Sequence, residues 1–255
     1  MKRSYKNEVQ DKLSSLNAQI ETRVLGNISS GKTFIPVYYV NAGQNKKPRV
    51  LLSTGIHGDE PAGVYALIEF LKGPIVDYLD KLNFSIFPCL NPWGFEHDKR
   101  TNLYGVDINR SFVKNNSVIA LILKRQIAAN PNYTLAINLH EDNTQIQVDG
   151  FPKEENPRAF YLYDNSRELQ NFGASIINKL RTQGIEICNN ETIYGEKNNQ
   201  GVIVSIPSKG EFEEFLRRHT NRIIVTENPT CWSLEKRVSV QLKALLTALD
   251  FAVSE

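Results

Sequence analysis

The sequence predicts an α/β fold, a three-layer α/β/α sandwich around a central mixed β-sheet. Short apolar segments rich in Val and Ile alternate with helical patterns along the chain, which is typical of a sheet covered by helices. Several of these segments are apolar throughout, as strands buried on both faces should be. Because no repeat or low-complexity tract divides the chain, we expect residues 1–255 to form a single domain.

The predicted elements begin with an amphipathic helix over residues 5–24, where apolar residues from Val9 to Ile20 recur at helical spacing. The segment NAGQNKKP (41–48) predicts a turn, and we expect it to join the first two strands as a hairpin. Strands are predicted at 33–40, 49–54, 84–90, 134–140, 159–163, 202–206 and 222–227. Further helices are predicted at 61–72, 117–129, 166–183 and 233–253.

Composition excludes several functional classes. The hydrophobic fraction of 41% and charged fraction of 23% are those of an ordinary globular protein, and no run approaches a membrane span. A net charge of +2 gives no electrostatic argument for nucleic acid or a membrane surface, so we expect neither as a partner. The three cysteines form no CxxC pair and the N-terminal segment has no apolar stretch of signal-peptide length. We therefore expect a cytoplasmic protein, whose oligomeric state the sequence does not determine.

The motif STGIHGDEPAG (53–63) places a histidine and two acids at the end of a predicted buried strand. His57 and Glu60 stand three residues apart, and zinc accepts both imidazole nitrogen and carboxylate oxygen. An ordinary helix start explains the same residues, because Asp59 or Glu60 would favour the helix dipole and Pro61 suits the first turn. The motif alone leaves both interpretations open.

Other strand ends supply the residues that a metal site needs. In such sheets ligands gather beyond the carboxyl ends of the central strands, and His140 and Glu227 each close a predicted strand there. His140 offers a third ligand, although a strand-end histidine also serves as a capping group. Glu227 emerges from a buried strand, which is costly unless the carboxylate is paired or used, for example as a general base near a metal. A helix cap is the alternative role for Glu227.

The segment 91–112 follows another strand end and shows little regular periodicity. A loop of about twenty residues in a compact domain is usually functional. It contains Arg100, Asn109 and Arg110, and the planar fork of arginine is suited to a carboxylate. A surface loop with solvated arginines is the alternative.

Taken in order, the words HGDE, NPWG, GVDINRSF, INLHE and VTENP, between about residues 50 and 230, resemble the zinc carboxypeptidase family, the carboxypeptidase A-like metallopeptidases. The short chain is similar to cytoplasmic bacterial-type members. The resemblance implies one Zn²⁺ per chain, and it implies a role for each matching residue. His57, Glu60 and His140 would bind the zinc; Glu227 would deprotonate the zinc water and protonate the leaving amine; Arg100 would stabilise the oxyanion; Asn109 and Arg110 would hold a terminal carboxylate; Asp107 would orient His57.

The implied function is a zinc metallocarboxypeptidase that hydrolyses an amide bond next to a free terminal carboxylate in a short peptide, peptidoglycan-derived peptides included. The alternative is an N-acyl-amino-acid amidohydrolase of the succinylglutamate desuccinylase/aspartoacylase type, a branch that usually lacks the word GVD. A third hypothesis is a non-catalytic binding module. The complete set of implied zinc ligands, together with Glu227, argues against it. The mobile tyrosine of the family has no counterpart in VIVSIPSKGEFEEF (202–215), and Tyr194 is the nearest tyrosine.

Overall fold

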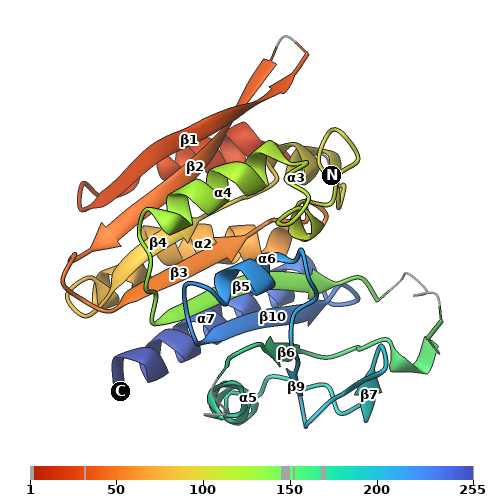
Figure 1. Ribbon diagram of the computed structural model, residues 1–255. Coiled ribbons are helices and arrows are strands. Elements are labelled where there is room, and N and C mark those ends of the chain that lie inside the picture. The colour runs from red at the N-terminus through yellow and green to blue at the C-terminus, as the bar shows by residue number, and fades with distance from the viewer. Residues whose placement is uncertain (1–2, 32, 145–149, 152, 168–170, 255) are drawn as a thin grey trace.

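The computed structural model describes residues 3–31, 33–144, 150–151, 153–167 and 171–254 (Figure 1). Eight strands form one mixed sheet: β1 (Ile20–Ser30), β2 (Thr33–Gly43), β3 (Arg49–Thr54), β4 (Asn83–Phe87), β5 (Leu135–Asp142), β6 (Tyr161–Asp164), β9 (Val202–Val204) and β10 (Ile223–Pro229). Their order in the sheet is β1-β2-β4-β3-β5-β10-β6-β9. The short strands β7 (Thr192–Ile193) and β8 (Glu196–Lys197) form a separate hairpin.

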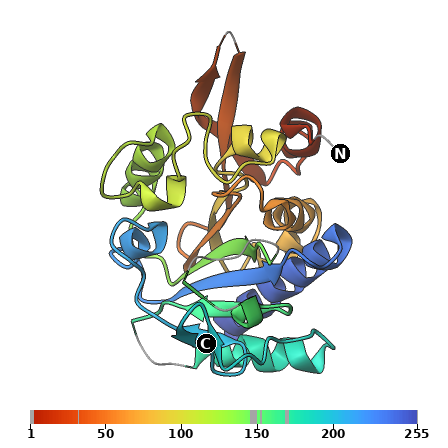
Figure 2. The same ribbon diagram turned by 90° about the vertical axis from the view of Figure 1, so that its right-hand side faces the viewer.

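The helices are α1 (Asp11–Leu13), α2 (Pro61–Lys72), α3 (Pro92–His97), α4 (Val118–Ala128), α5 (Phe172–Thr182), α6 (Phe212–Leu216) and α7 (Leu234–Ser254). A π-helical turn η1 (Lys6–Gln10) and the 3-10 turns η2 (Pro74–Tyr78), η3 (Ile108–Arg110) and η4 (Lys153–Glu155) complete the elements. In Figure 2, α2, α5 and α7 lie on one side of the sheet, and α4 and α6 lie on the other. The predicted three-layer α/β/α arrangement is therefore confirmed.

Four parallel strands form the centre of the sheet. β3 pairs with β4 and with β5, and β5 pairs with β10, all in parallel. The apolar residues of these strands are buried, because helices cover both faces. Their carboxyl ends meet at one edge, where His140 of β5 is the register partner of Glu227 of β10. This edge is where the predicted site residues were expected.

The predicted N-terminal helix is wrong for most of its length. Only Lys6–Leu13 is helical, with Val9 and Leu13 buried as expected, and residues 20–24 belong to β1. Ile20 pairs with Ala42 of β2. This pairing is non-local, so spacing within a short window of sequence could not reveal it.

The predicted hairpin at residues 41–48 is also wrong. β2 pairs with β1 and β4, and β4 separates it from β3, so the segment connects two strands that are not neighbours. The segment 91–112 is more regular than predicted, because it contains α3 and η3. The predicted helix 166–183 corresponds to α5, which begins at Phe172. Residues 168–170 lie outside the described residues.

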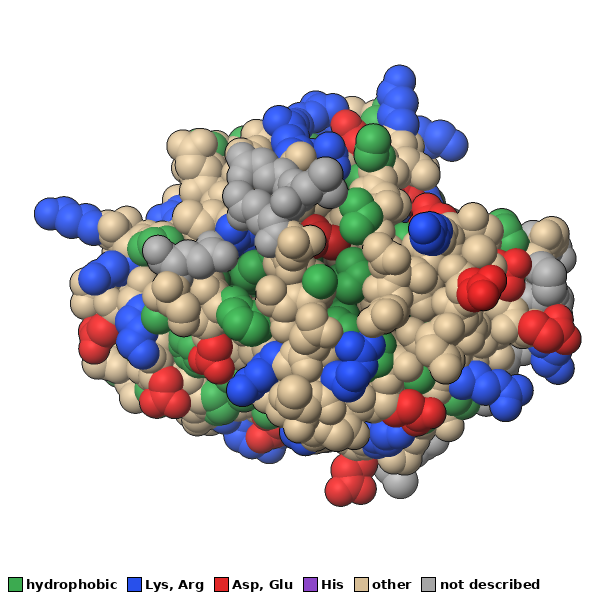
Figure 3. Space-filling view, turned by 90° about the horizontal axis from the view of Figure 1, so that it is seen from below, with side chains coloured by type: hydrophobic (Ala, Val, Ile, Leu, Met, Phe, Trp, Pro, Cys, Tyr) green, Lys and Arg blue, Asp and Glu red, His purple; other side chains and the backbone are tan. Residues whose placement is uncertain are grey.

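The face at the β9 end of the sheet, seen from below in Figure 3, is mixed in character. Hydrophobic side chains gather near its middle, and lysine, arginine and acidic side chains surround them. Val204 and Ile206, in and just after β9, are exposed. Among the described helices, none has the length and apolarity that crossing a membrane requires.

Candidate metal centre

The corner between β3 and α2 is shaped by a close approach of two backbones. A Cβ atom on Gly58 would lie 2.0 Å from the carbonyl carbon of Gly94, so the motifs HGDE and NPWG are in backbone contact at their glycines. Asn91, the first residue of NPWG, caps α3 by accepting a hydrogen bond from Gly94 N at 3.0 Å. Its Nδ2 donates to Arg100 O at 3.2 Å. These contacts hold His57 and the following acids beside the segment that carries Arg100.

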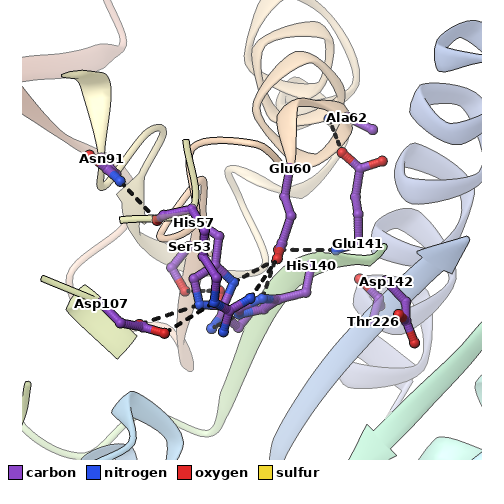
Figure 4. A network of polar contacts seen from close by, with 12 residues as sticks. Ser53, His57, Glu60, Ala62, Asn91, Asp107, His140, Glu141, Asp142 and Thr226 are labelled. Atoms are coloured by element: carbon purple, nitrogen blue, oxygen red, sulfur yellow. Dashed lines mark hydrogen bonds and ion pairs between the residues drawn. The ribbon is translucent and has the colours of Figure 1, made fainter. Parts of the chain in front are cut away.

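Glu60 stands at the N-cap position of α2 but makes no capping bond. Its Oε1 lies 2.6 Å from His57 Nδ1 and its Oε2 lies 2.9 Å from His140 Nδ1 (Figure 4). Glu141 caps the helix instead, because its carboxylate accepts from Ala62 N at 2.7 Å. Glu60 thus turns its carboxylate to the two histidines and not to the first amides of α2.

His57, Glu60 and His140 form a buried cluster whose ligand atoms all lie within 4.8 Å of one another. Burial alone would raise the pKa of Glu60, but the two histidines hold it well below its usual range. Burial likewise lowers the pKa of His57, yet the Glu60 and Asp107 carboxylates outweigh it and raise the pKa to about 9. Both imidazoles turn Nδ1 toward the same carboxylate, and two imidazoles plus a carboxylate are a donor set that zinc takes in catalytic sites. The residues thus fit a metal ion.

The opposite nitrogen of His57 faces Asp107. His57 Nε2 and Asp107 Oδ1 lie 3.5 Å apart, and both atoms are buried without a hydrogen bond among the described residues. Asp107 Oδ2 accepts from Arg100 Nε at 3.1 Å. Arg100 also reaches Glu60, with NH1 3.5 Å from Oε1. The structure therefore brings Asp107 and Arg100 to the cluster.

A pocket of about 760 Å³ opens over the cluster. It is lined by the ligands and by Arg100, Asn109, Arg110 and Glu227, so all the predicted site residues except Asp107 line it. Burial raises the pKa of Glu227 well above its usual range, and the nearby carboxylates of Glu60 and Asp142 raise it further. A carboxyl group of raised pKa holds a proton more readily than an ordinary carboxylate does, so it can both accept and return one.

Asn109 and Arg110 have partners within the protein. Asn109 is buried, and its Oδ1 accepts from Phe212 N at 3.0 Å, which fixes the start of α6. Arg110 NH1 forms an ion pair with Glu211 Oε1 at 3.0 Å, and its side chain is 52% exposed. A substrate group would therefore meet the Nδ2 group of Asn109 and the remaining edge of the Arg110 guanidinium.

Asp142, Tyr161, Glu211 and Glu213 also line the pocket, and the sequence did not predict them as site residues. Asp142, two residues after His140, accepts hydrogen bonds from Tyr161 Oη at 2.7 Å and Tyr194 Oη at 2.9 Å. Tyr194 has a φ of 51°, a conformation that non-glycine residues rarely adopt and that is often found at functional sites. Glu211, just before α6, and Glu213, within it, line the pocket as well. The signal for Asp142 was the alternation in HED, whose first and third residues share one face of a strand.

Solved structures share this fold over almost the whole chain. A Shewanella denitrificans protein, proposed to be a metallopeptidase, superposes with a TM-score of 0.78 at 22% identity, over 97% of this chain and 88% of that one. A metallo-carboxypeptidase from Burkholderia cenocepacia gives 0.68 at 15% identity, over 97% and 69%. A succinylglutamate desuccinylase from Silicibacter sp. TM1040 gives 0.62 at 15% identity, over 91% and 66%. The fold and the His–Glu–His cluster define a class of proteins with a metallocarboxypeptidase-like fold and a candidate metal site.

Within this class, residues 46–183 match the succinylglutamate desuccinylase/aspartoacylase catalytic domain, which is more than half of the chain. The chain belongs to this family. It is also similar in part to carboxypeptidases: 30% identical over 125 residues to carboxypeptidase E of Caenorhabditis elegans, which is 40% of this chain and 26% of that protein. Carboxypeptidase SOL1 of Arabidopsis thaliana is 36% identical over 66 residues, 22% of this chain and 13% of that protein. The matched part is about a quarter or less of these relatives.

Proposed function

We propose that the chain is a zinc-dependent hydrolase that cleaves the amide bond next to a free terminal carboxylate in a short peptide. The observation that carries this proposal is one pocket that combines a buried His57–Glu60–His140 cluster with Glu227 and two arginines. These are the parts that metal-assisted amide hydrolysis requires: ligands, a base, and donors for a developing oxyanion. His57, Glu60 and His140 would hold the ion. When bound, zinc supplies Lewis acidity, which polarises a carbonyl group and makes water more acidic.

The protein's own groups then have distinct roles in the proposal. Glu227 accepts the proton of the attacking water and returns it to the leaving amine nitrogen, a use that suits its raised pKa. Arg100, beside Glu60, donates to the carbonyl oxygen as negative charge develops there. Asp107 orients His57 from its Nε2 side. Asn109 and Arg110 bind the terminal carboxylate at the pocket wall.

A second candidate is favoured by the family match, namely hydrolysis of an N-acyl amino acid. The charge of the pocket supports the first candidate over the second. Eight acidic side chains line it against two arginines: Asp59, Glu60, Glu141, Asp142, Glu196, Glu211, Glu213 and Glu227 against Arg100 and Arg110. Burial raises the pKa of several of these acids, Asp142 and Glu227 among them, but acidic side chains still outnumber basic ones, which favours substrates that carry an ammonium group over N-acylated dicarboxylates. A peptide with a free amine has one.

The test is kcat/KM for a panel of substrates with zinc-loaded protein. The panel contains short peptides with free amino and carboxyl termini, a peptidoglycan-derived peptide, the matching N-acetylated peptides, and N-succinyl and N-acetyl amino acids. We expect the peptides with a free amine to be cleaved fastest. Preferred turnover of the N-acyl amino acids would instead establish the second candidate, and no turnover of any amide by zinc-loaded protein would contradict both.

A further inference from the structure

The second histidine of the cluster has a buried carboxylate behind it. His140 turns Nδ1 toward Glu60, so Nε2 is the nitrogen that faces away from the proposed metal position. Two side chains lie next to Nε2: Asn138 Nδ2 at 2.9 Å and Glu213 Oε1 at 3.9 Å. His57 has the same arrangement, with Asp107 beside its Nε2. Each imidazole thus has a carboxylate near the nitrogen that does not face Glu60.

The side chain of Asn138 is fixed by partners at both ends. Ser53 Oγ donates to Asn138 Oδ1 at 3.1 Å, and Asn138 Nδ2 donates to Glu213 Oε1 at 2.5 Å. Because Oδ1 is engaged by Ser53, the NH2 group is the part of Asn138 that faces His140 and Glu213. Ser53, Asn138 and Glu213 are all buried, so water does not replace any of these partners readily. The network therefore defines the polar surroundings of His140 Nε2.

In this structure Asn138 Nδ2 donates to His140 Nε2 at 2.9 Å; when the proton is on Nε2 instead, that contact must be given up, and Glu213 is the carboxylate beside Nε2 that can accept it. A neutral imidazole that binds a metal through Nδ1 carries its proton on Nε2, and ligating histidines usually donate that proton to a carboxylate or carbonyl. The NH2 group of Asn138 is a donor and cannot accept it. Closing the 3.9 Å separation to a hydrogen bond requires a shift of about 1 Å.

Glu213 is also a carboxylate that needs compensation. It is 4% exposed, and among the described residues Asn138 is the one hydrogen-bond donor to its carboxylate. A buried charge with a single neutral donor is costly. A protonated or metal-bound imidazole beside it offsets this cost. Asn109, a proposed substrate-binding residue, also positions Glu213, because it accepts a hydrogen bond from Phe212 N at the start of α6.

We propose that Glu213 is a positioning residue for the metal centre: its carboxylate accepts the Nε2 proton of His140 and so directs the Nδ1 lone pair toward the ion. This inference rests on the proposed zinc site, but it concerns a residue that neither the motifs nor the family match points to. Loss of such a partner weakens metal binding by about 10- to 100-fold. Glu214, next in the sequence, is partly buried, pairs with Arg218 at 3.2 Å and does not line the pocket, so it provides a matched control.

The experiment measures the zinc dissociation constant by chelator competition in wild type, Glu213→Gln, Glu213→Leu and Glu214→Gln. We expect about tenfold weaker binding in Glu213→Gln, where the amide oxygen is a poorer acceptor, and up to about 100-fold in Glu213→Leu. Glu214→Gln should bind zinc as wild type does. Circular dichroism establishes that each variant is folded. Wild-type affinity in a folded Glu213→Leu protein would overturn the inference, as would equal weakening in Glu214→Gln.

A second measurement uses wild type alone and so does not depend on the variants folding. In zinc-loaded protein labelled with ¹⁵N-histidine, His140 should show a protonated, exchange-protected Nε2. An unprotonated Nε2, or one whose proton exchanges freely with water, would overturn the assignment of Glu213. Failure of wild type to bind zinc at all would overturn the proposed metal centre itself, which is a different result from an unchanged affinity in the variants.

Discussion

Replacing Arg110 by alanine tests whether the pocket recognises a terminal carboxylate. The guanidinium already has one carboxylate partner, because NH1 lies 3.0 Å from Glu211 Oε1. Glu211 is itself fixed at its other oxygen, which accepts from Ser208 N at 2.8 Å. Arg110 therefore offers a substrate only the part of its fork that Glu211 leaves, in an electrostatic environment that Glu211 has partly neutralised.

The expected magnitude follows from this geometry. A charge-assisted hydrogen bond in a dry site contributes about 1.5–3 kcal/mol. An exposed ion pair contributes about 0.2–1 kcal/mol. Arg110 is 52% exposed and already paired, so we place its contribution between these limits, at about 0.5–1.5 kcal/mol. The Arg110→Ala variant should then lose about two- to tenfold in kcat/KM on a peptide with a free C-terminus.

The assay compares a peptide acid with its C-terminal amide in wild type, Arg110→Ala and Glu211→Gln. Arg110→Ala should lower kcat/KM on the acid and leave the amide rate nearly unchanged, with normal zinc content, since Arg110 is not a ligand. Glu211→Gln removes the competing negative charge, so it should raise the acid-to-amide ratio. Equal rates on acid and amide in wild type would refute carboxylate recognition by Arg110. A fall on both substrates alike in Arg110→Ala would assign the arginine a structural role.

Two further predictions concern the metal centre and the base. His57→Ala and His140→Ala should each abolish stoichiometric zinc and activity, and metal analysis of the double variant checks the assignment, because retained zinc would exclude these ligands. Glu227 is active as a base only when deprotonated, so its raised pKa places the acid-side loss of kcat/KM at a higher pH than for an ordinary glutamate. Glu227→Gln should keep zinc and lose about 10²–10⁴-fold in kcat, and wild-type turnover in that variant would remove Glu227 from the mechanism.

The central part of the fold was predictable because its signals are local. The strand over Arg49–Thr54 and the helix over Pro61–Lys72 have the predicted boundaries, since one is a continuous apolar run and the other begins with proline and ends before glycine. The edge strand β1 was missed because the spacing of its first apolar residues also fits a helix. Only the pairing of β1 with β2, which begins at Ile20 and Ala42, identifies the segment as a strand. The hairpin at 41–48 failed for a related reason: the order of strands in a sheet depends on contacts between segments distant in sequence.

The site residues, too, were predictable only where the signal is local. His57, His140 and Glu227 could be located because the carboxyl ends of parallel strands share one edge, so position in a strand determines position in space. Glu211 and Glu213 could not, because they lie in or just before the five-residue helix α6, and the three acids of GEFEEF are typical of a solvated surface. Glu213 is buried and Glu211 is partly buried because α6 packs against the segment around Asn109.

That packing connects the two halves of the site. Asn109 holds the N-terminus of α6 through Phe212 N. Glu211, just before the helix, pairs with Arg110, and Glu213, two residues after Glu211, lies beside His140. A displacement of α6 would therefore alter both Arg110, the proposed carboxylate-binding group, and the carboxylate beside His140, a proposed metal ligand. Since the same short helix bears on both, substrate recognition and metal affinity should be coupled through it. A zinc affinity that changes when a peptide acid binds, and that does not change when its amide binds, is the consequence of this arrangement.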